Sequence, residues 1–230
     1  MGRFPQPKGT KGSLKWTQLL INKCPELINN RLRDLGRVSH ISEITWLSPI
    51  EKDDFAEYRN GAFLELLGID LTKRPLATFW PSRGPQWDAL GRAETGEIFL
   101  VESKAHIKEL LSTGSQASRK SMILIERSLK EVQSFLRINP TADWSKVFYQ
   151  YANRISHLYL LRELNNLPAF LVFQYFLGDR EMAGPSTVKE WKSALELVNG
   201  VLGLRDSHKL SEYILEVFID VQKIENATVI

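Results

Sequence analysis

The chain of 230 residues has the length of one elaborated domain, and its 43% hydrophobic residues are enough to build a buried core. Charged residues at 25% complete an ordinary globular composition, which excludes a wholly disordered or fibrous protein. The single cysteine, Cys24, excludes a disulfide framework, and the four histidines are too scattered for a Cys/His zinc site. The polar N-terminus lacks the apolar core of a signal peptide, and no apolar run is long enough to cross a bilayer. We therefore expect a soluble cytoplasmic protein with no membrane partner.

Positive charge is concentrated at the N-terminus. The first forty residues carry eight Lys or Arg and two Asp or Glu, whereas the whole chain has a net charge of +3. A basic N-terminal region on a near-neutral protein can bind phosphates. It is equally typical of a solvated arm without a binding role. Residues 1–12 contain Gly, Pro and Lys without periodicity, so we expect a flexible basic arm followed by a single domain over 13–230.

The first third of the sequence predicts mainly helices. Apolar residues recur at helical spacing in two early segments, and a third helix follows a capping box formed by Ser48, Pro49 and Glu51. Proline suits the first turn of that helix, and Gly68 suits its end. The expected elements are helices at 14–21, 25–35 and 49–67 and a strand or extended connector at 40–47.

The remainder of the sequence predicts an α/β arrangement. Two strand-like segments flank the loop from Gly91 to Gly96, which is typical of a β-hairpin. Thr187 and Glu190 have the spacing of a capping box, which predicts the start of a late helix. The expected elements are strands at 74–80, 85–90, 97–106, 169–177 and 213–221 and helices at 117–138, 142–164 and 187–202. This order predicts an α/β fold whose mixed central sheet is flanked by helices.

Charged residues end the apolar strand expected at 97–106. Because side chains alternate along a strand, Glu102, Lys104 and His106 share one face. Burying a charged group that is neither paired nor bound to an ion costs on the order of several kcal/mol. The expected hairpin could also bring Asp88 close to Glu102, and a hard divalent cation would relieve the repulsion between two carboxylates.

This pattern, D-x13-E-x-K across a β-hairpin, resembles the PD-(D/E)xK nuclease superfamily. The resemblance covers about residues 49–177 and implies the restriction-endonuclease-like fold with its αβββαβ core. It implies that Asp88 and Glu102 bind Mg²⁺, for which Mn²⁺ would substitute, and that Lys104 is catalytic. The chain departs from the family pattern at one position, because Trp87 rather than proline precedes Asp88.

Further residues follow from the same resemblance. The family often has another acid on the preceding helix, and Glu57 is the preferred candidate for it, with Glu65 and Glu51 as rivals. A surface position on that helix is the ordinary alternative for Glu57. Gln150 and Arg154 lie four residues apart on one face of the helix expected at 142–164, either as a weak nucleic-acid-binding pair or as part of a solvated face.

The resemblance implies a magnesium-dependent nuclease that hydrolyses phosphodiester bonds, with DNA as the expected substrate and a homodimer as a possible assembly. His106 would contact a phosphate in this interpretation, or else be a locally bonded histidine. Trp80 and Trp87 would stack on bases, or pack in the core. The alternative function is a nucleic-acid-binding or assembly module on the same fold that cleaves nothing.

Overall fold

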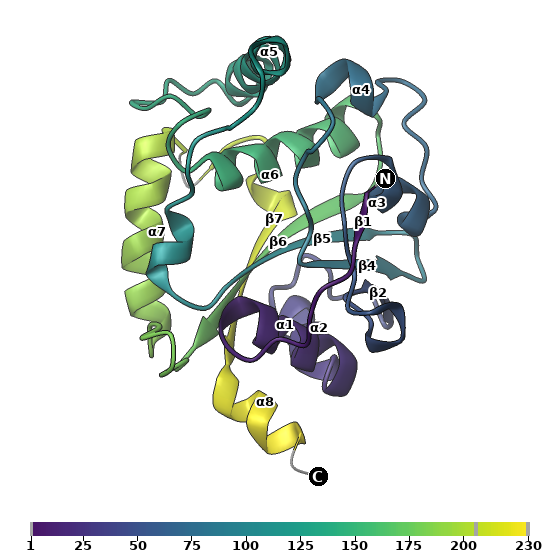
Figure 1. The fold of residues 1–230 in the computed structure, drawn as a ribbon, viewed down its shortest axis with the longest axis vertical. Coiled ribbons are helices and arrows are strands. Elements are labelled where there is room, and N and C mark those ends of the chain that lie inside the picture. The colour runs from purple at the N-terminus through teal and green to yellow at the C-terminus, as the bar shows by residue number, and fades with distance from the viewer. Residues whose placement is uncertain (1, 205–206, 229–230) are drawn as a thin grey trace.

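The computed structural model describes residues 2–204 and 207–228 and is built around a five-stranded mixed sheet in the order β2-β4-β5-β6-β7 (Figure 1). The strands are β2 (Ile44–Ser48), β4 (Ala89–Ala93), β5 (Ile98–Lys104), β6 (Ala169–Leu177) and β7 (Ile214–Asp220). β2, β4 and β5 pair antiparallel, whereas β5, β6 and β7 run parallel. β5 and β6 are mostly apolar because both of their faces are covered, and the polar residues of β5 are confined to its end.

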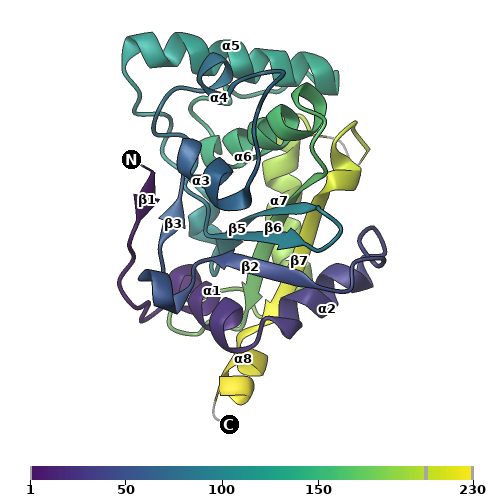
Figure 2. The same cartoon turned by 90° about the vertical axis from the view of Figure 1, so that its right-hand side faces the viewer.

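Helices cover both faces of this sheet (Figure 2). One face packs on α1 (Gly12–Lys23), α2 (Glu26–Asp34) and α8 (Val221–Thr228). The other packs on α3 (Gly61–Leu67), α4 (Leu76–Phe79), α5 (Arg119–Leu136), α6 (Tyr149–Tyr159) and α7 (Val188–Leu202). Successive residues of β5 contribute to opposite cores, since Phe99 packs with the first set and Leu100 with the second. The expectation of an α/β fold with a mixed, helix-flanked sheet is therefore confirmed.

Most elements from β5 onward lie close to the positions that the sequence predicts for them. The strand predicted at 169–177 is β6 with the same bounds, and the strands predicted at 97–106 and 213–221 are β5 and β7. The helix predicted at 117–138 is α5. Both reciprocal hydrogen bonds of the Thr187–Glu190 capping box are present at the start of α7. Among the described residues, no helix combines the length and hydropathy needed to cross a membrane.

The region from 48 to 90 differs from the sequence prediction. The helix predicted at 49–67 is wrong over its first two-thirds, because Ser48 ends β2 and both Asp54 and Phe55 have left-handed backbones that no helix tolerates. A turn of 3-10 helix, η1 (Glu51–Asp53), and a short strand, β3 (Glu57–Tyr58), precede α3.

Three other predicted elements also differ from the structure. The strand at 74–80 is wrong, since Pro75 opens the short helix α4 and accepts a hydrogen bond from Thr78 Oγ. The strand at 85–90 begins only at Ala89. The helix predicted at 142–164 starts at Tyr149, because Phe148 is left-handed, and ends in a turn of π-helix, η3 (Leu160–Leu164).

The N-terminal segment, expected as an arm, pairs with the body of the protein. β1 (Arg3–Phe4) is antiparallel to β3, and the Arg59 N–H donates to the Gly2 carbonyl at 2.8 Å. Of the eight basic residues among the first forty, five form ion pairs with nearby acids: Arg3, Lys15, Lys23, Arg31 and Arg33. Much of the N-terminal positive charge is therefore compensated locally.

Two glycines test the packing of this fold. A Cβ on Gly91 in β4 would lie 2.9 Å from the Trp46 ring and 3.1 Å from Ile44 Cγ2, whereas a Cβ on Gly200 in α7 would meet nothing within 4 Å. We expect Gly91→Ala to lower the free energy of unfolding by about 1–3 kcal/mol through overpacking. Gly200→Ala should raise it by about 0.5–1 kcal/mol through helix propensity. Urea unfolding of both variants checks this, and a Gly91→Ala protein as stable as wild type would contradict it.

Candidate active site

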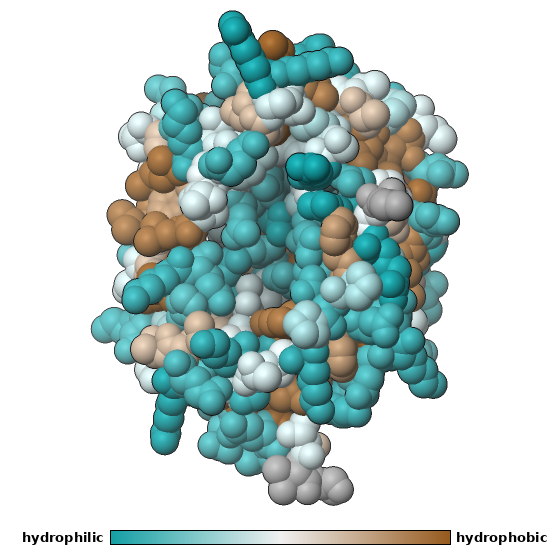
Figure 3. Space-filling view, viewed as in Figure 1, coloured by the Kyte–Doolittle hydropathy of each residue, from teal (hydrophilic) through white to brown (hydrophobic). Residues whose placement is uncertain are grey.

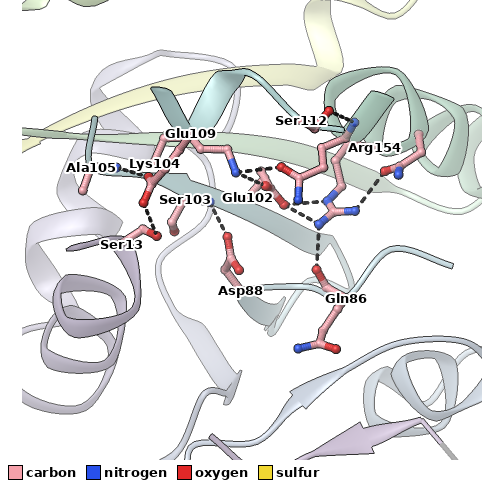
Figure 4. A network of polar contacts seen from close by, with 12 residues as sticks. Ser13, Gln86, Asp88, Glu102, Ser103, Lys104, Ala105, Glu109, Ser112 and Arg154 are labelled. Atoms are coloured by element: carbon pink, nitrogen blue, oxygen red, sulfur yellow. Dashed lines mark hydrogen bonds and ion pairs between the residues drawn. The ribbon is translucent and has the colours of Figure 1, made fainter. Parts of the chain in front are cut away.

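The hairpin of β4 and β5 brings the motif residues together. Glu102 and Lys104 project from the same face of β5 and are 3% and 9% exposed. Asp88, half-buried, lies just before β4, where its N–H donates to the Val101 carbonyl at 3.2 Å. In return the Ser103 N–H donates to Asp88 Oδ2 at 2.7 Å (Figure 4). Backbone pairing therefore fixes the Asp88 carboxylate beside the strand that carries Glu102 and Lys104.

Glu57 joins this cluster from β3 rather than from the predicted helix. It is 8% exposed, and its Oε2 accepts hydrogen bonds from Gln86 Nε2 at 2.5 Å and from Gln6 Nε2 at 3.3 Å. Its two rivals lie elsewhere: Glu51 is exposed and paired with Lys23, and Glu65 is exposed on α3. Within the described residues, the hydrogen bonds to the third acid of the site thus come from neutral amide groups.

The pair expected on the helix also reaches the cluster. Arg154, on α6 and 4% exposed, donates from Nε to Glu102 Oε2 at 2.6 Å and from Nη2 to the Gln86 carbonyl at 2.7 Å (Figure 4). Lys104 Nζ donates to Glu102 Oε1 and, at 3.2 Å, to Gln150 Oε1. Both oxygens of the Glu102 carboxylate therefore face a cation.

These contacts separate the charge states of the acids. Burial raises the pKa of Asp88 well above its ordinary value, and repulsion from Glu102 and Glu57 adds to the effect. Burial likewise raises the pKa of Glu57. Burial opposes ionisation of Glu102 as well, but Arg154 and Lys104 outweigh it and hold its pKa below the usual range. The site thus holds one fully compensated carboxylate beside two acids that resist ionisation.

The acids lie in a groove of about 560 Å³. One wall is the segment 83–86, and the other is formed by 111–116 together with the start of α6. Figure 3 shows the face of the molecule that is turned to the viewer in Figure 1, with a hollow near its middle that is surrounded mostly by hydrophilic side chains. His106 is not among the lining residues, and its Nε2 lies 3.5 Å from Oε1 of Glu109, which does line the groove.

Sequence reasoning missed three polar residues near the acids. Gln86 precedes Asp88 by two residues, so strand alternation was a usable signal for it. Gln6 carried no such signal, because its contact with Glu57 spans 51 positions. Glu109 accepts hydrogen bonds from the Ala105 N–H at 2.6 Å and from Ser13 Oγ at 3.2 Å, which ties α1 to the end of β5.

The oxygen-rich donor set is of the kind that hard divalent cations prefer. Within the described residues, no three His, Cys, Asp or Glu side chains meet as a ready metal-binding group. The Asp88 and Glu102 carboxylates nevertheless repel each other, and Asp88 Oδ1 receives no hydrogen bond from the residues that the structure describes. Each oxygen of Glu102 can also accept more than one partner. Asp88 and Glu102 therefore fit a Mg²⁺ ion that Glu102 would share with Arg154.

Comparison with known proteins adds no assignment: no family model, curated protein or solved structure matches this chain.

The raised pKa of Asp88 predicts a dependence of stability on pH. A carboxyl group whose pKa is higher in the folded protein contributes stability below its unfolded value of about 4, and this is lost as the pH rises through the folded pKa. We expect Asp88→Asn, measured in EDTA, to flatten this loss and to raise the free energy of unfolding at pH 8 by about 1–2 kcal/mol.

The matched control is Glu65→Gln, which neutralises an exposed carboxylate outside the groove. It should leave the dependence of the unfolding free energy on pH unchanged. An Asp88→Asn protein with the same pH dependence as wild type would show that Asp88 does not carry unfavourable charge in the folded state.

Proposed function

We propose that this chain is a metal-dependent nuclease of the PD-(D/E)xK type that hydrolyses phosphodiester bonds in DNA. The observation that carries the proposal is the convergence of Asp88, Glu102 and Lys104 at one end of the β4–β5 hairpin. A buried carboxylate beside a second acid and a lysine is costly for stability, which favours a functional reason for the arrangement.

The order of the strands supports the restriction-endonuclease-like fold as part of this proposal. Three antiparallel strands, β2, β4 and β5, precede the helices α5 and α6, and β6 then returns parallel to β5. The first of these strands is at Ile44–Ser48 rather than at 74–80. The proposed core thus begins slightly before the 49–177 region of the sequence resemblance.

Each residue of the site has a separate role in the proposed reaction. Asp88 and Glu102 would hold Mg²⁺, which supplies Lewis-acid activation of the phosphate and of a bound water. Lys104, fixed by Glu102 and Gln150, directs a positive charge into the groove, where it can orient that water or neutralise charge on the phosphate. Glu57 can accept a proton or hold a water through the oxygen that Gln86 and Gln6 leave free. Arg154 keeps Glu102 ionised and directed into the groove.

One observation favours the second candidate, a nucleic-acid-binding or assembly module without cleavage. Both oxygens of Glu102 already face cations, Arg154 and Lys104, so the carboxylate is satisfied without a metal ion. A module of this kind would retain the fold and the groove and would depend on neither Mg²⁺ nor Lys104.

Cleavage assays separate the two candidates. We expect supercoiled plasmid or single-stranded DNA to be hydrolysed in Mg²⁺ or Mn²⁺ but not in EDTA. Lys104→Ala should lower the rate at least about 100-fold, the usual effect of losing a proton-transfer or charge-stabilising group. Asp88→Asn should have a similar effect without unfolding the protein, whereas Glu102→Gln should abolish cleavage and also lower stability, because it leaves Lys104 and Arg154 without their buried counter-charge.

The control for these variants is Lys108→Ala, since Lys108 is exposed in the adjacent turn of 3-10 helix, η2 (Ile107–Leu110), and does not line the groove. It should cleave like wild type. DNA binding without hydrolysis by the wild type, unchanged in Lys104→Ala, would instead support the non-catalytic module.

A further inference from the structure

The reacting groups of the proposed nuclease lie deep in the groove. Glu102, Glu57 and Lys104 are 3%, 8% and 9% exposed, so a substrate phosphate must enter the groove to reach them. The volume of about 560 Å³ is within the range of pockets that enclose a single small ligand. A nucleotide or two of a strand fits a space of this volume.

Hydrogen bonds pin both walls of the groove. On one side, the Gly84 N–H donates to Asn60 Oδ1 at 3.0 Å, and Arg154 holds the Gln86 carbonyl. On the other, the Ser115 N–H donates to the Ser145 carbonyl at 2.8 Å, and a Cβ on Gly114 would lie 2.9 Å from Lys146 Cα. Both walls are therefore attached to the body of the protein.

The groove offers little free positive charge. Its lining contains four acids, and its buried cations Lys104 and Arg154 are both paired with Glu102. Arg83 is the one lining cation without an ion pair within 2–204 and 207–228. Lys and Arg side chains contact the phosphates of duplexes and of single strands alike, so this lining suits a contact with one phosphate through Arg83 rather than with the many phosphates of a duplex.

The groove does offer an aromatic surface. Tyr149 lines it and is half-buried, and its ring stacks on Trp80 with centroids 6.5 Å apart and an interplanar angle of 22°. Trp80 is 2% exposed and packs in turn against the buried His157. Tyr149 is thus a firmly supported ring at the groove, of the kind on which unpaired bases stack.

We propose that the substrate enters this groove as single-stranded DNA, with a base stacked on Tyr149 and a neighbouring phosphate paired with Arg83. This inference rests on the proposed nuclease function, because it is that function which places a nucleic acid in the groove. It assigns Tyr149 and Arg83 to substrate binding and assigns no chemical step to either.

Binding measurements test this separately from cleavage. Fluorescence anisotropy with a labelled 16-nucleotide single strand and the corresponding blunt duplex, in Ca²⁺ with the oligonucleotides shown to stay intact, gives both Kd values. We expect the single strand to bind at least about 10-fold more tightly. Tyr149→Leu should weaken its binding about 10-fold, the effect of losing one stacked base, whereas Tyr149→Phe should bind like wild type.

Arg83→Ala provides a second variant, at an exposed side chain that makes no hydrogen bond or ion pair with the residues that the structure describes. It should weaken single-strand binding and lower its salt dependence by about one ion. Duplex binding as tight as single-strand binding, or unchanged binding by both Tyr149→Leu and Arg83→Ala, would overturn the inference even if the protein cleaves DNA. Single-strand preference without hydrolysis in any divalent cation would instead overturn the nuclease function and leave the binding mode in place.

Discussion

The burial of Glu102 constrains much of this structure. A carboxylate that is 3% exposed in the middle of a sheet is tolerated only when its charge is compensated, and here two cations do so. Lys104 comes from the same strand, but Arg154 comes from α6, so the ion pair fixes the position of that helix over the sheet. The same guanidinium also binds the Gln86 carbonyl and lies 4.9 Å from the centre of the Trp87 ring. One buried charge thus ties together β5, α6 and the segment that leads to Asp88.

The uneven distribution of compensating charge gives the site its chemical character. Glu102 has two cationic partners, whereas Asp88 receives a backbone N–H and Glu57 receives two side-chain amides. Burial and mutual repulsion therefore fall on Asp88 and Glu57, whose pKa values rise. Such an arrangement stores unfavourable electrostatic energy that a cation or a proton relieves, and this is the physical link between the packing and the hydrolysis that we propose.

The sequence indicated those parts of the site that depend on local pattern. The alternation of β5 placed Glu102 and Lys104 on one face, and the hairpin placed Asp88 beside them, because both features follow from residues adjacent in sequence or across one turn. Helical spacing likewise put Gln150 and Arg154 on one face of α6. For His106, which follows the end of β5, the role in contacting a phosphate stays a prediction.

Chain composition, periodicity and capping signals by themselves determined the α/β class, the bounds of β6 and the start of α7, since these depend on interactions within a few residues. Only the tertiary structure decided that Glu57 lies on a strand, because its segment pairs with β1 more than fifty positions away. It also decided that Arg154 faces Glu102 and that most of the basic residues near the N-terminus pair with acids, several of them distant in sequence. Contacts between distant segments depend on how whole elements pack, and no local pattern records that packing.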